Sequence, residues 1–316
     1  MSVAEDTGRL DSRKFQNPLR TLAGEPRAFV DLKALETLWV NTGTLCNVTC
    51  ANCYIESSPR NDRLAYISHA EVAAYLDEID TGELGTKLIG FTGGEPFMNP
   101  DMLAMLEDTL SRGHQVLVLT NAMKPMWHRR DGLLALRKAH GERLVLRVSV
   151  DHYTQAVHEA ERGVGTWAPM IEGLSWLREN DFTLNIAGRN LTGEPEAQLR
   201  DGFARMFKTL GLTLDPNDPV DLVIFPEMDA SADVPEITEA CWGILSVSPE
   251  AQMCASARMV VKRKGAAAPA VVACTLLPYD QQFELGTTLA EAERRVHLNH
   301  PHCARFCVLG GASCGG

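Results

Sequence analysis

Three cysteines stand close together near the start of the chain, which reads CNVTCANC over residues 46–53. Thiolates at this spacing can bind three corners of a cubane iron–sulfur cluster, and no fourth cysteine lies nearby to close it. One iron would then keep an open coordination position, the feature that separates catalytic from structural metal sites. Cys46, Cys50 and Cys53 are therefore candidate ligands of a catalytic 4Fe–4S cluster. The alternative is a zinc knob or a closed cluster completed by a distant cysteine.

A pair of glycines follows in the run FTGGEP at residues 91–96. Because they lack a Cβ atom, Gly93 and Gly94 let the backbone approach a ligand closely. Their N–H and C=O groups can then bond the ammonium and carboxylate groups of an amino acid. Two glycines alone predict only a turn, but their place at the end of a predicted strand, downstream of the cysteines, favours a ligand site.

Polar residues end the predicted strands that follow. As candidates for the site we take Thr120, Asn121, Ser149, Asp151, His152, Asn185, Gly188 and Arg189. In α/β barrels the carboxyl ends of the strands face the active site, although polar residues there also serve as caps and loop anchors. Asp151 and His152 are the candidates for contact with substrate, His152 as a proton shuttle. A hydrogen-bonded structural role for His152 is the alternative.

A second group of cysteines lies in the C-terminal part of the chain. Its members are Cys254, Cys274, Cys303, Cys307 and Cys314. Their number and grouping predict a metal site. Because His300 and His302 stand beside Cys303, zinc suits this region as well as iron. Cys241, next to Trp242, is typical of a buried apolar thiol.

Strands and helices alternate between residues 36 and 226. The predicted strands are 36–42, 87–92, 115–120, 144–150, 182–188 and 221–225, and the helices between them include 68–79, 100–111, 167–179 and 195–210. Ser68 and Glu71 form a capping box at the start of the first of these helices. This alternation indicates an α/β fold with a parallel sheet. Six units are fewer than the eight of a complete barrel, so we predict an open, partial (β/α)6 barrel.

The pattern changes after about residue 240. Residues 258–264 and 270–273 predict a hairpin joined through Gly265, and residues 288–296 predict a helix. We therefore expect an N-terminal extension over residues 1–35, the barrel over 36–240 and a small metal-binding module over 241–316.

The bulk composition is that of an ordinary globular protein, with 316 residues of which 45% are hydrophobic. A net charge of −11 repels phosphate, which argues against a nucleic-acid partner. No apolar segment approaches the roughly 20 residues needed to span a bilayer, and residues 1–35 contain no secretory signal. We expect a cytoplasmic protein without membrane contact. Since thiols stay reduced in that compartment, nine cysteines favour metal ligation over disulfides.

The CxxxCxxC loop after the first strand, with the GGEP run, resembles the radical S-adenosylmethionine (SAM) superfamily. The resemblance implies an enzyme that cleaves SAM reductively at a 4Fe–4S cluster, using a flavodoxin- or ferredoxin-type electron donor. The products are methionine and a 5′-deoxyadenosyl radical that removes hydrogen from a substrate. Within the motif Gly93, Gly94, Glu95 and Pro96, the glycines border the SAM amino group and the glutamate helps fix it. Ser149 would approach the ribose and Arg189 the carboxylate.

One position departs from the family pattern. Many members carry an aromatic residue directly before the third cysteine, where this chain has Asn52, and Tyr54 follows that cysteine instead. The C-terminal cysteines, with Leu285-Gly286 among them, resemble twitch or SPASM modules, which hold auxiliary 4Fe–4S clusters. Five cysteines suffice for one cluster, so the resemblance implies the twitch form. Its ligands would be Cys254, Cys274 and two of Cys303, Cys307 and Cys314, with zinc as the alternative.

The substrate is open at this point. Relatives with such a tail often modify peptides or proteins, which makes a peptide the favoured substrate and a small biosynthetic intermediate the alternative. Because the first strand begins near residue 36, we expect no preceding leader-peptide-binding domain, and a peptide would be held by the barrel mouth or delivered by a partner. The rival class is a non-catalytic iron–sulfur carrier or scaffold. The glycine–glutamate run argues against it, because a carrier needs no ligand pocket there.

Overall fold

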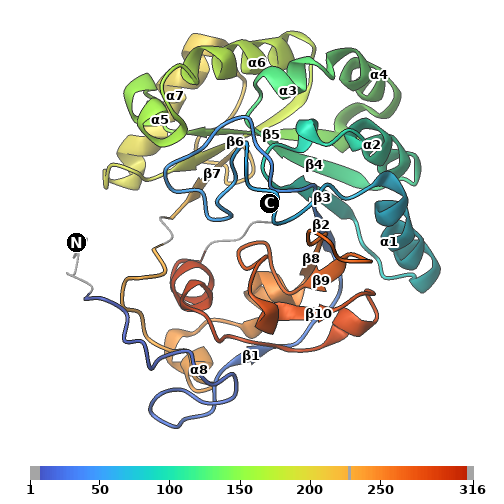
Figure 1. Ribbon diagram of the computed structural model, residues 1–316. Helices are drawn as coiled ribbons and strands as arrows, with labels where there is room; N and C mark the ends of the chain where they lie inside the picture. Colours follow the sequence, from blue (N-terminus) through green and yellow to red (C-terminus); the bar gives the residue numbers. More distant parts are fainter. Residues whose placement is uncertain (1–7, 227–228, 312–316) are drawn as a thin grey trace.

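One curved mixed sheet organises the molecule in the computed structural model, which describes residues 8–226 and 229–311. Among these residues the sheet has nine strands in the order β10-β9-β8-β2-β3-β4-β5-β6-β7. Figure 1 shows the helices of the first two thirds of the chain on one side of the sheet and the C-terminal strands below them. The α/β prediction is confirmed.

Six neighbouring strands are parallel and form the partial barrel. Their bounds are Thr37–Asn41 (β2), Leu88–Thr92 (β3), Gln115–Thr120 (β4), Leu144–Asp151 (β5), Thr183–Arg189 (β6) and Leu222–Phe225 (β7). Each lies where the sequence predicts it. Parallel strands read as continuous apolar runs because both faces are covered, and this pattern is what made them recognisable.

Helices pack on the outer face of these strands (Figure 1). Their bounds are His69–Gly82 (α1), Met102–Ser111 (α2), Lys124–Trp127 (α3), Arg130–His140 (α4), Gln155–Arg162 (α5), Trp167–Glu179 (α6) and Glu196–Leu210 (α7). The predicted capping box is present, since the Ser68 hydroxyl accepts from the Glu71 backbone and the Glu71 carboxylate accepts from the Ser68 backbone. The apolar faces of the helices and the outward-facing residues of the strands form one core.

The C-terminal part extends the same sheet. The predicted hairpin is present as Ala257–Val261 (β8) and Ala270–Val272 (β9), with Glu284–Gly286 (β10) beside it. β8 runs parallel to β2, so the hairpin continues directly from the barrel. A short helix, Cys241–Leu245 (α8), precedes it, and a π-helical turn, Cys303–Val308, follows.

The predicted helix over residues 288–296 is wrong. Only a 3₁₀ turn, Glu291–Glu293, forms there, and the chain then enters the short strand Val296–His297 (β11). The Glu291 carboxylate accepts hydrogen bonds from the backbone N–H groups of Thr287 and Thr288. Since the Glu291 N–H in turn donates to the Thr288 hydroxyl, this is the same capping arrangement as at Ser68, and it starts one turn. The turn ends because the carbonyls of Ala292 and Arg294 accept from the Arg258 guanidinium and residues 296–297 pair with β1.

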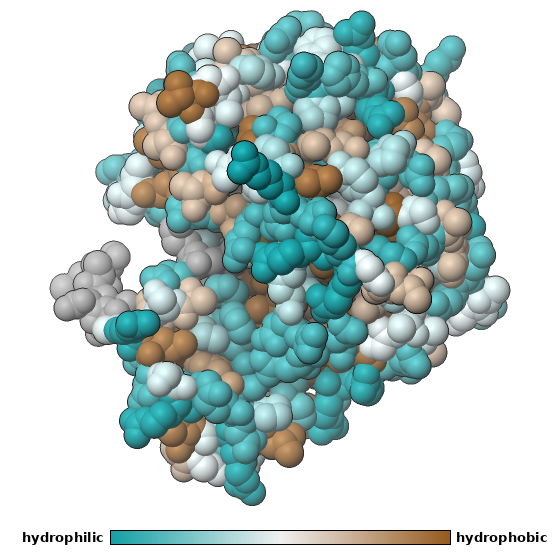
Figure 2. Space-filling model, viewed as in Figure 1, coloured by the Kyte–Doolittle hydropathy of each residue, from teal (hydrophilic) through white to brown (hydrophobic). Residues whose placement is uncertain are grey.

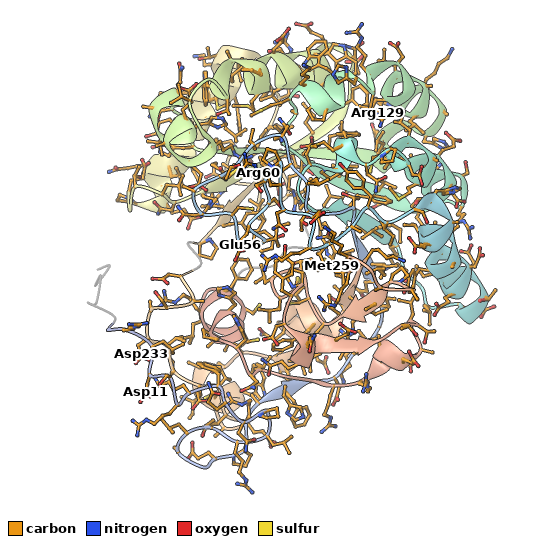
Figure 3. All side chains as sticks on the ribbon, in the orientation of Figure 1. Asp11, Glu56, Arg60, Arg129, Asp233 and Met259 are labelled. Carbon is orange, nitrogen blue, oxygen red and sulfur yellow. The ribbon has the colours of Figure 1, made fainter. Side chains whose placement is uncertain are left out.

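The N-terminal residues lie along the C-terminal part. Strand Phe29–Val30 (β1) pairs antiparallel with β11, and Asp11 lies close to Asp233 in Figure 3. The buried Arg27 guanidinium donates to the Glu236 carboxylate at 2.5 Å. The proposed division of the chain at residues 35 and 240 stays a prediction.

The surface carries few large apolar side chains. On the face shown in Figure 2, hydrophilic residues predominate and apolar ones are scattered. Within residues 8–226 and 229–311, no helix combines the length and apolarity that a bilayer crossing requires.

Candidate active site

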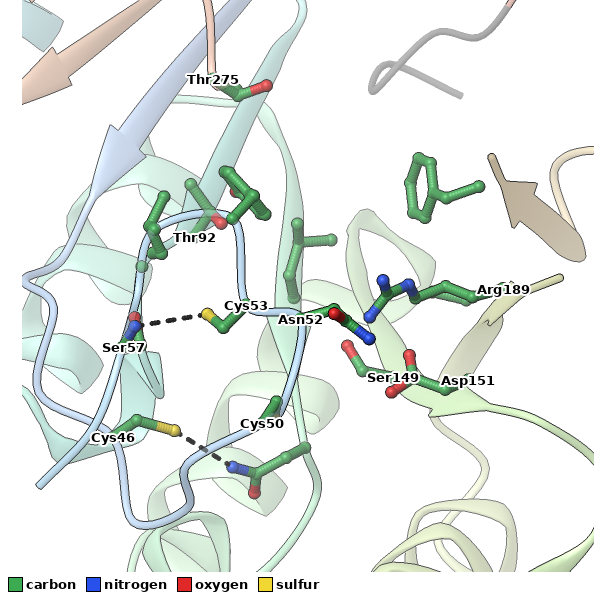
Figure 4. Close-up of a pocket in the computed structure, with 18 of the residues that line it drawn as sticks. Cys46, Cys50, Asn52, Cys53, Ser57, Thr92, Ser149, Asp151, Arg189 and Thr275 are labelled. Atoms are coloured by element: carbon green, nitrogen blue, oxygen red, sulfur yellow. Dashed lines mark hydrogen bonds between the residues drawn. The ribbon is translucent and has the colours of Figure 1, made fainter. Parts of the chain in front are cut away.

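A cavity of about 190 Å³ opens at the carboxyl ends of the parallel strands. Residues predicted for the site that line it are Cys46, Cys50, Cys53, Gly93, Gly94, Thr120, Asn121, Ser149, Asp151 and Arg189. Figure 4 shows the cysteine loop on one side, facing Ser149, Asp151 and Arg189 on β5 and β6. Thr275, Leu276 and Phe306 of the C-terminal part line the cavity as well. Residues from all six parallel strands, or from the loops that follow them, thus line one cavity.

The cysteine loop leaves β2 and continues through Glu56 and Arg60, labelled in Figure 3. The Cys46 thiol lies 3.9 Å from the Asn121 side-chain nitrogen, and the Cys53 thiol accepts from the Ser57 backbone at 3.3 Å (Figure 4). Burial raises the pKa of the Cys46 thiol to about 12 and that of Cys50 to about 11. Buried thiols of this kind ionise readily only beside a cation, which suits them as metal ligands.

The glycine run packs directly on the cysteine loop. The Gly94 N–H donates to the Gly43 carbonyl at 2.8 Å, and the Glu95 N–H donates to the Leu45 carbonyl at 3.1 Å. A Cβ atom on Gly94 would lie 2.2 Å from the Leu45 oxygen. Gly93 has φ of 140°, a conformation that L side chains rarely adopt. Both glycines are therefore required to bring the end of β3 against the loop.

Glu95 lies behind the cavity wall. Its side chain accepts from the Thr120 hydroxyl at 2.9 Å, the Asn121 N–H at 2.8 Å and the Phe97 N–H at 3.2 Å. Burial raises the pKa of this carboxyl to about 7, although these hydrogen bonds oppose the rise. Glu95 therefore connects the ends of β3 and β4, and Pro96 starts the 3₁₀ turn that follows it.

His152, Asn185 and Gly188 are not among the residues that line the cavity. His152 is buried, with Nδ1 2.9 Å from the Thr154 hydroxyl and Nε2 2.9 Å from the Glu194 carboxylate. A Cβ atom on Gly188 would meet the ring of Phe203, so this residue faces helix α7. The contacts of His152 match the structural alternative, and its catalytic role stays a prediction.

Asp151 occupies a strained position at the end of β5. Its φ is 60°, in the left-handed region that few non-glycine residues adopt. Two hydrogen bonds from the Arg162 guanidinium, at 2.7 and 3.1 Å, hold its carboxylate. Strain of this kind persists where the surroundings fix it, commonly at functional sites.

Sequence reasoning missed two residues at the end of helix α5. Glu161 and Arg162 line the cavity, and Glu161 also accepts from Arg189 at 2.7 Å. Arg162 is a largely buried cation, 12% exposed, whose charge acts on both Cys46 and Cys50. They are the last two residues of the eight-residue helix that follows β5, so no local spacing marks them. Only the packing of α5 against the cysteine loop brings them to the site.

In the second cysteine group, several thiols lie near Cys303. Burial raises the pKa of the Cys303 thiol, and Cys274, Cys307 and Cys254 lie close enough to it for their charges to add to this rise. Cys314 lies outside the described residues. Cys241 is half-buried and its sulfur accepts from the Thr238 N–H at 3.3 Å.

The two neighbouring histidines pack together beside this group. The rings of His300 and His302 have centroids 4.7 Å apart, and burial lowers the pKa of His300 to about 4. In the described part of the chain, no three His, Cys, Asp or Glu side chains converge as ligands of a single metal ion. The metal assignments of individual residues stay predictions.

The partial barrel, with thiols and a glycine turn around one cavity at its strand ends, defines an α/β enzyme with a cysteine-ligated cofactor site. The chain belongs to the radical SAM superfamily, whose family model matches residues 40–201. It is accordingly a SAM-dependent enzyme of the class that uses a 4Fe–4S cluster. Three thiols and an adjacent glycine backbone around one cavity fit that pair of cofactors.

Curated relatives match only part of their own length. The antilisterial bacteriocin subtilosin biosynthesis protein AlbA of Bacillus subtilis is 29% identical over 144 residues, 45% of this chain and 30% of AlbA. The mycofactocin maturase MftC of Mycobacterium ulcerans is 27% identical over 169 residues, 54% of this chain and 43% of MftC. This chain thus spans less than half the length of either relative.

Solved structures share the fold. Streptococcus suis SuiB bound to S-adenosylmethionine superposes with a TM-score of 0.58 at 11% identity, covering 80% of this chain and 63% of SuiB. The structure of anSMEcpe with bound AdoMet gives 0.57 at 14% identity, covering 81% and 79%. At these identities the likeness shows the fold alone.

Proposed function

We propose that this chain is a radical SAM enzyme that modifies a peptide or protein. The observation that carries the proposal is the single cavity in which the three thiols of the cysteine loop face the glycine run and the polar ends of β5 and β6. The cluster and SAM, when bound, supply the 5′-deoxyadenosyl radical that removes hydrogen from the substrate. The residues of this chain hold and orient these groups.

Each part of the cavity has a distinct task in this proposal. Cys46, Cys50 and Cys53 would ligate the cluster and leave one iron open. The backbone of Gly93 and Gly94 would contact the SAM amino acid group. Arg189 and Arg162 both line the cavity and are the candidates to attract the SAM carboxylate. Each also donates to a carboxylate of this chain, Arg189 to Glu161 and Arg162 to Asp151.

Two other residues act by holding their neighbours. Glu95 fixes Thr120 and Asn121 from behind, and Asp151 orients the Arg162 guanidinium. Ser149, with its side chain directed into the cavity, is the candidate for the ribose of SAM (Figure 4).

A peptide substrate is supported by the named roles of the relatives and by the space available. AlbA is a bacteriocin biosynthesis protein and MftC a maturase. A second cavity of about 470 Å³ shares Arg147, Phe225 and Pro226 with the first. It runs beside β7, the edge strand of the described sheet, so an extended chain can enter there.

A small-molecule substrate is the second candidate. The AdoMet-dependent heme synthase of Methanosarcina barkeri is 26% identical over 144 residues, 45% of this chain and 38% of that enzyme. That relative is named for a small-molecule product. The proteins similar to this chain thus include some named for peptides and one named for a small molecule.

The C-terminal thiols would bind an auxiliary 4Fe–4S cluster. Cys254, Cys274, Cys303 and Cys307 supply a four-sulfur donor set, which suits iron–sulfur clusters and zinc. The first cavity reaches this region through Thr275 and Phe306. A cluster beside the substrate cavity can take part in electron transfer, which favours it over zinc. The external electron donor would be of the flavodoxin or ferredoxin type.

The activity is tested by anaerobic reconstitution with iron and sulfide, dithionite reduction and mass spectrometry for 5′-deoxyadenosine formed from SAM. The wild type is compared with the Cys46→Ala, Cys50→Ala, Cys53→Ala variant. We expect deoxyadenosine from the wild type only, with about four irons fewer per chain in the variant. If a fully loaded wild type binds SAM yet makes no deoxyadenosine with or without substrate, the proposed activity is wrong.

The substrate class is tested with peptides encoded by short open reading frames beside the gene. A peptide substrate should increase deoxyadenosine formation and change in mass by the loss of hydrogen. A neighbourhood of small-molecule biosynthetic enzymes, with no peptide that changes in mass, would favour the second candidate.

A further inference from the structure

A buried arginine stands beside the C-terminal thiols. Arg258, on β8, is 1% exposed. Its guanidinium donates to the carbonyl oxygens of Cys254 at 2.6 Å, Ala257 at 2.8 Å, Ala292 at 2.9 Å and Arg294 at 3.2 Å. All four acceptors are neutral, so they satisfy its donors without compensating its charge.

No carboxylate of residues 8–226 or 229–311 forms an ion pair with Arg258. Arg27, which is as buried as Arg258, is paired with Glu236 at 2.5 Å, and the largely buried Arg162 is paired with Asp151 at 2.7 Å. The groups whose charge would act on Arg258, once they ionise as metal ligands, are the thiols of Cys254 and Cys274. An uncompensated buried charge is costly, and the cysteine site is the compensation that this part of the molecule offers.

We propose that Arg258 is the electrostatic partner of the second cysteine site and raises the reduction potential of the cluster bound there. The inference rests on the proposed auxiliary cluster. One-electron reduction adds a negative charge to a cluster that already carries the charge of its thiolates. A fixed cation in a low-dielectric surrounding stabilises this reduced form more than the oxidised form. Arg258 therefore makes the second site easier to reduce.

The first cysteine site differs from the second in how the charge of its nearby arginine is balanced. There, the charge of Arg162 is balanced by Asp151 through two hydrogen bonds. At the second site no carboxylate in the described residues offsets Arg258. The two sites thus differ in local field, and the second is the more favourable place for an added electron.

The test isolates the second site by using the full chain with Cys46, Cys50 and Cys53 changed to alanine. Iron and zinc are counted first. Dithionite then supplies one electron at a time, and EPR spectroscopy gives the midpoint potential. Arg258→Met should shift that potential to lower values, whereas Arg258→Lys, which keeps the charge, should stay near the parent. Arg130→Met removes an exposed arginine on helix α4, 53% exposed, and should cause no shift.

The outcomes separate this inference from the proposal beneath it. Zinc or no metal in the parent would overturn the auxiliary cluster itself. Full iron in Arg258→Met with an unchanged potential would overturn only the role of Arg258. If Arg258→Met binds less iron than the parent, the midpoint potential is measured on Arg258→Gln instead. Loss of iron from both neutral variants but not from Arg258→Lys supports the charge role, and loss from the lysine variant too would show that Arg258 acts only through its hydrogen bonds.

Discussion

The carboxylate of Glu161 accepts a hydrogen bond from the side-chain amide of Asn52 at 2.9 Å. It also accepts from the Asn52 backbone N–H at 3.0 Å, and the Glu161 carbonyl accepts from the Ala51 N–H at 2.7 Å. Asn52 stands directly before Cys53, where many radical SAM proteins carry an aromatic residue. In this chain a polar contact with helix α5 therefore holds the loop at that position.

Asn52→Asp should weaken this hold. The substitution places a second carboxylate against Glu161, whose side chain is 3% exposed. Because residue 52 is exposed while Glu161 is buried, water screens part of the repulsion, and we expect the free energy of unfolding to fall by about 1 kcal/mol. The iron content after reconstitution should fall with it, since the loop carries the cluster cysteines. Urea unfolding and iron analysis measure the two effects.

A double-mutant cycle provides the control. Adding Glu161→Gln to Asn52→Asp restores a donor opposite the new carboxylate, so the double variant should recover part of the loss. Arg189 loses its ion pair with Glu161 in every protein that carries Glu161→Gln, and this effect cancels in the cycle. Strictly additive losses would show that the contact does not hold the loop.

The framework of the fold could be predicted from the sequence. The runs that became β2 to β7 are apolar and β-branched, because each strand of a parallel sheet is covered on both faces. The cysteine spacing and the glycine run mark the ends of the first two barrel strands, and both line the cavity. The local sequence pattern is enough to predict a site residue wherever its position along a strand decides the direction of its side chain.

The remainder depends on long-range packing. Glu161 and Arg162 reach the cavity only because α5 lies against the cysteine loop, and no spacing in the sequence encodes that contact. Glu95 was expected at the ligand, yet three donors hold it behind the cavity wall. The predicted helix over residues 288–296 has helix-forming residues, but the Ala292 and Arg294 carbonyls accept from the distant Arg258, and residues 296–297 pair with β1.

His152→Ala should affect stability more than SAM cleavage. Its ring contacts Thr154 and Glu194, which lie on the loops after β5 and β6. Loss of these bonds should lower the free energy of unfolding by about 1–3 kcal/mol. Deoxyadenosine formation without substrate should persist, because His152 does not line the cavity. A stable variant that cleaves SAM but makes no product would instead support a substrate-side role.

Gly94→Ala should prevent cluster binding. The new Cβ atom would meet the backbone of Leu45 at 2.2 Å, and backbone cannot yield as a flexible side chain can. We expect a destabilisation of about 2–3 kcal/mol and little bound iron, since Leu45 directly precedes Cys46. Gly243→Ala is the control, because nothing lies within 4 Å of a Cβ atom there. Normal iron content in Gly94→Ala would contradict the close approach of the two loops.

Glu95 should make stability depend on pH. Burial raises its pKa in the folded chain to about 7 from the model-peptide value of 4.5. Between these values the folded state binds more protons than the unfolded state, so this contribution to stability falls as pH rises. Glu95→Gln does not titrate. The free energy of unfolding of the wild type, minus that of Glu95→Gln at equal metal content, should therefore drop by up to about 3 kcal/mol between pH 4 and pH 8. Urea unfolding at several pH values measures this difference, other titrating groups cancel in it, and a difference that stays constant with pH would show that Glu95 is ionised throughout.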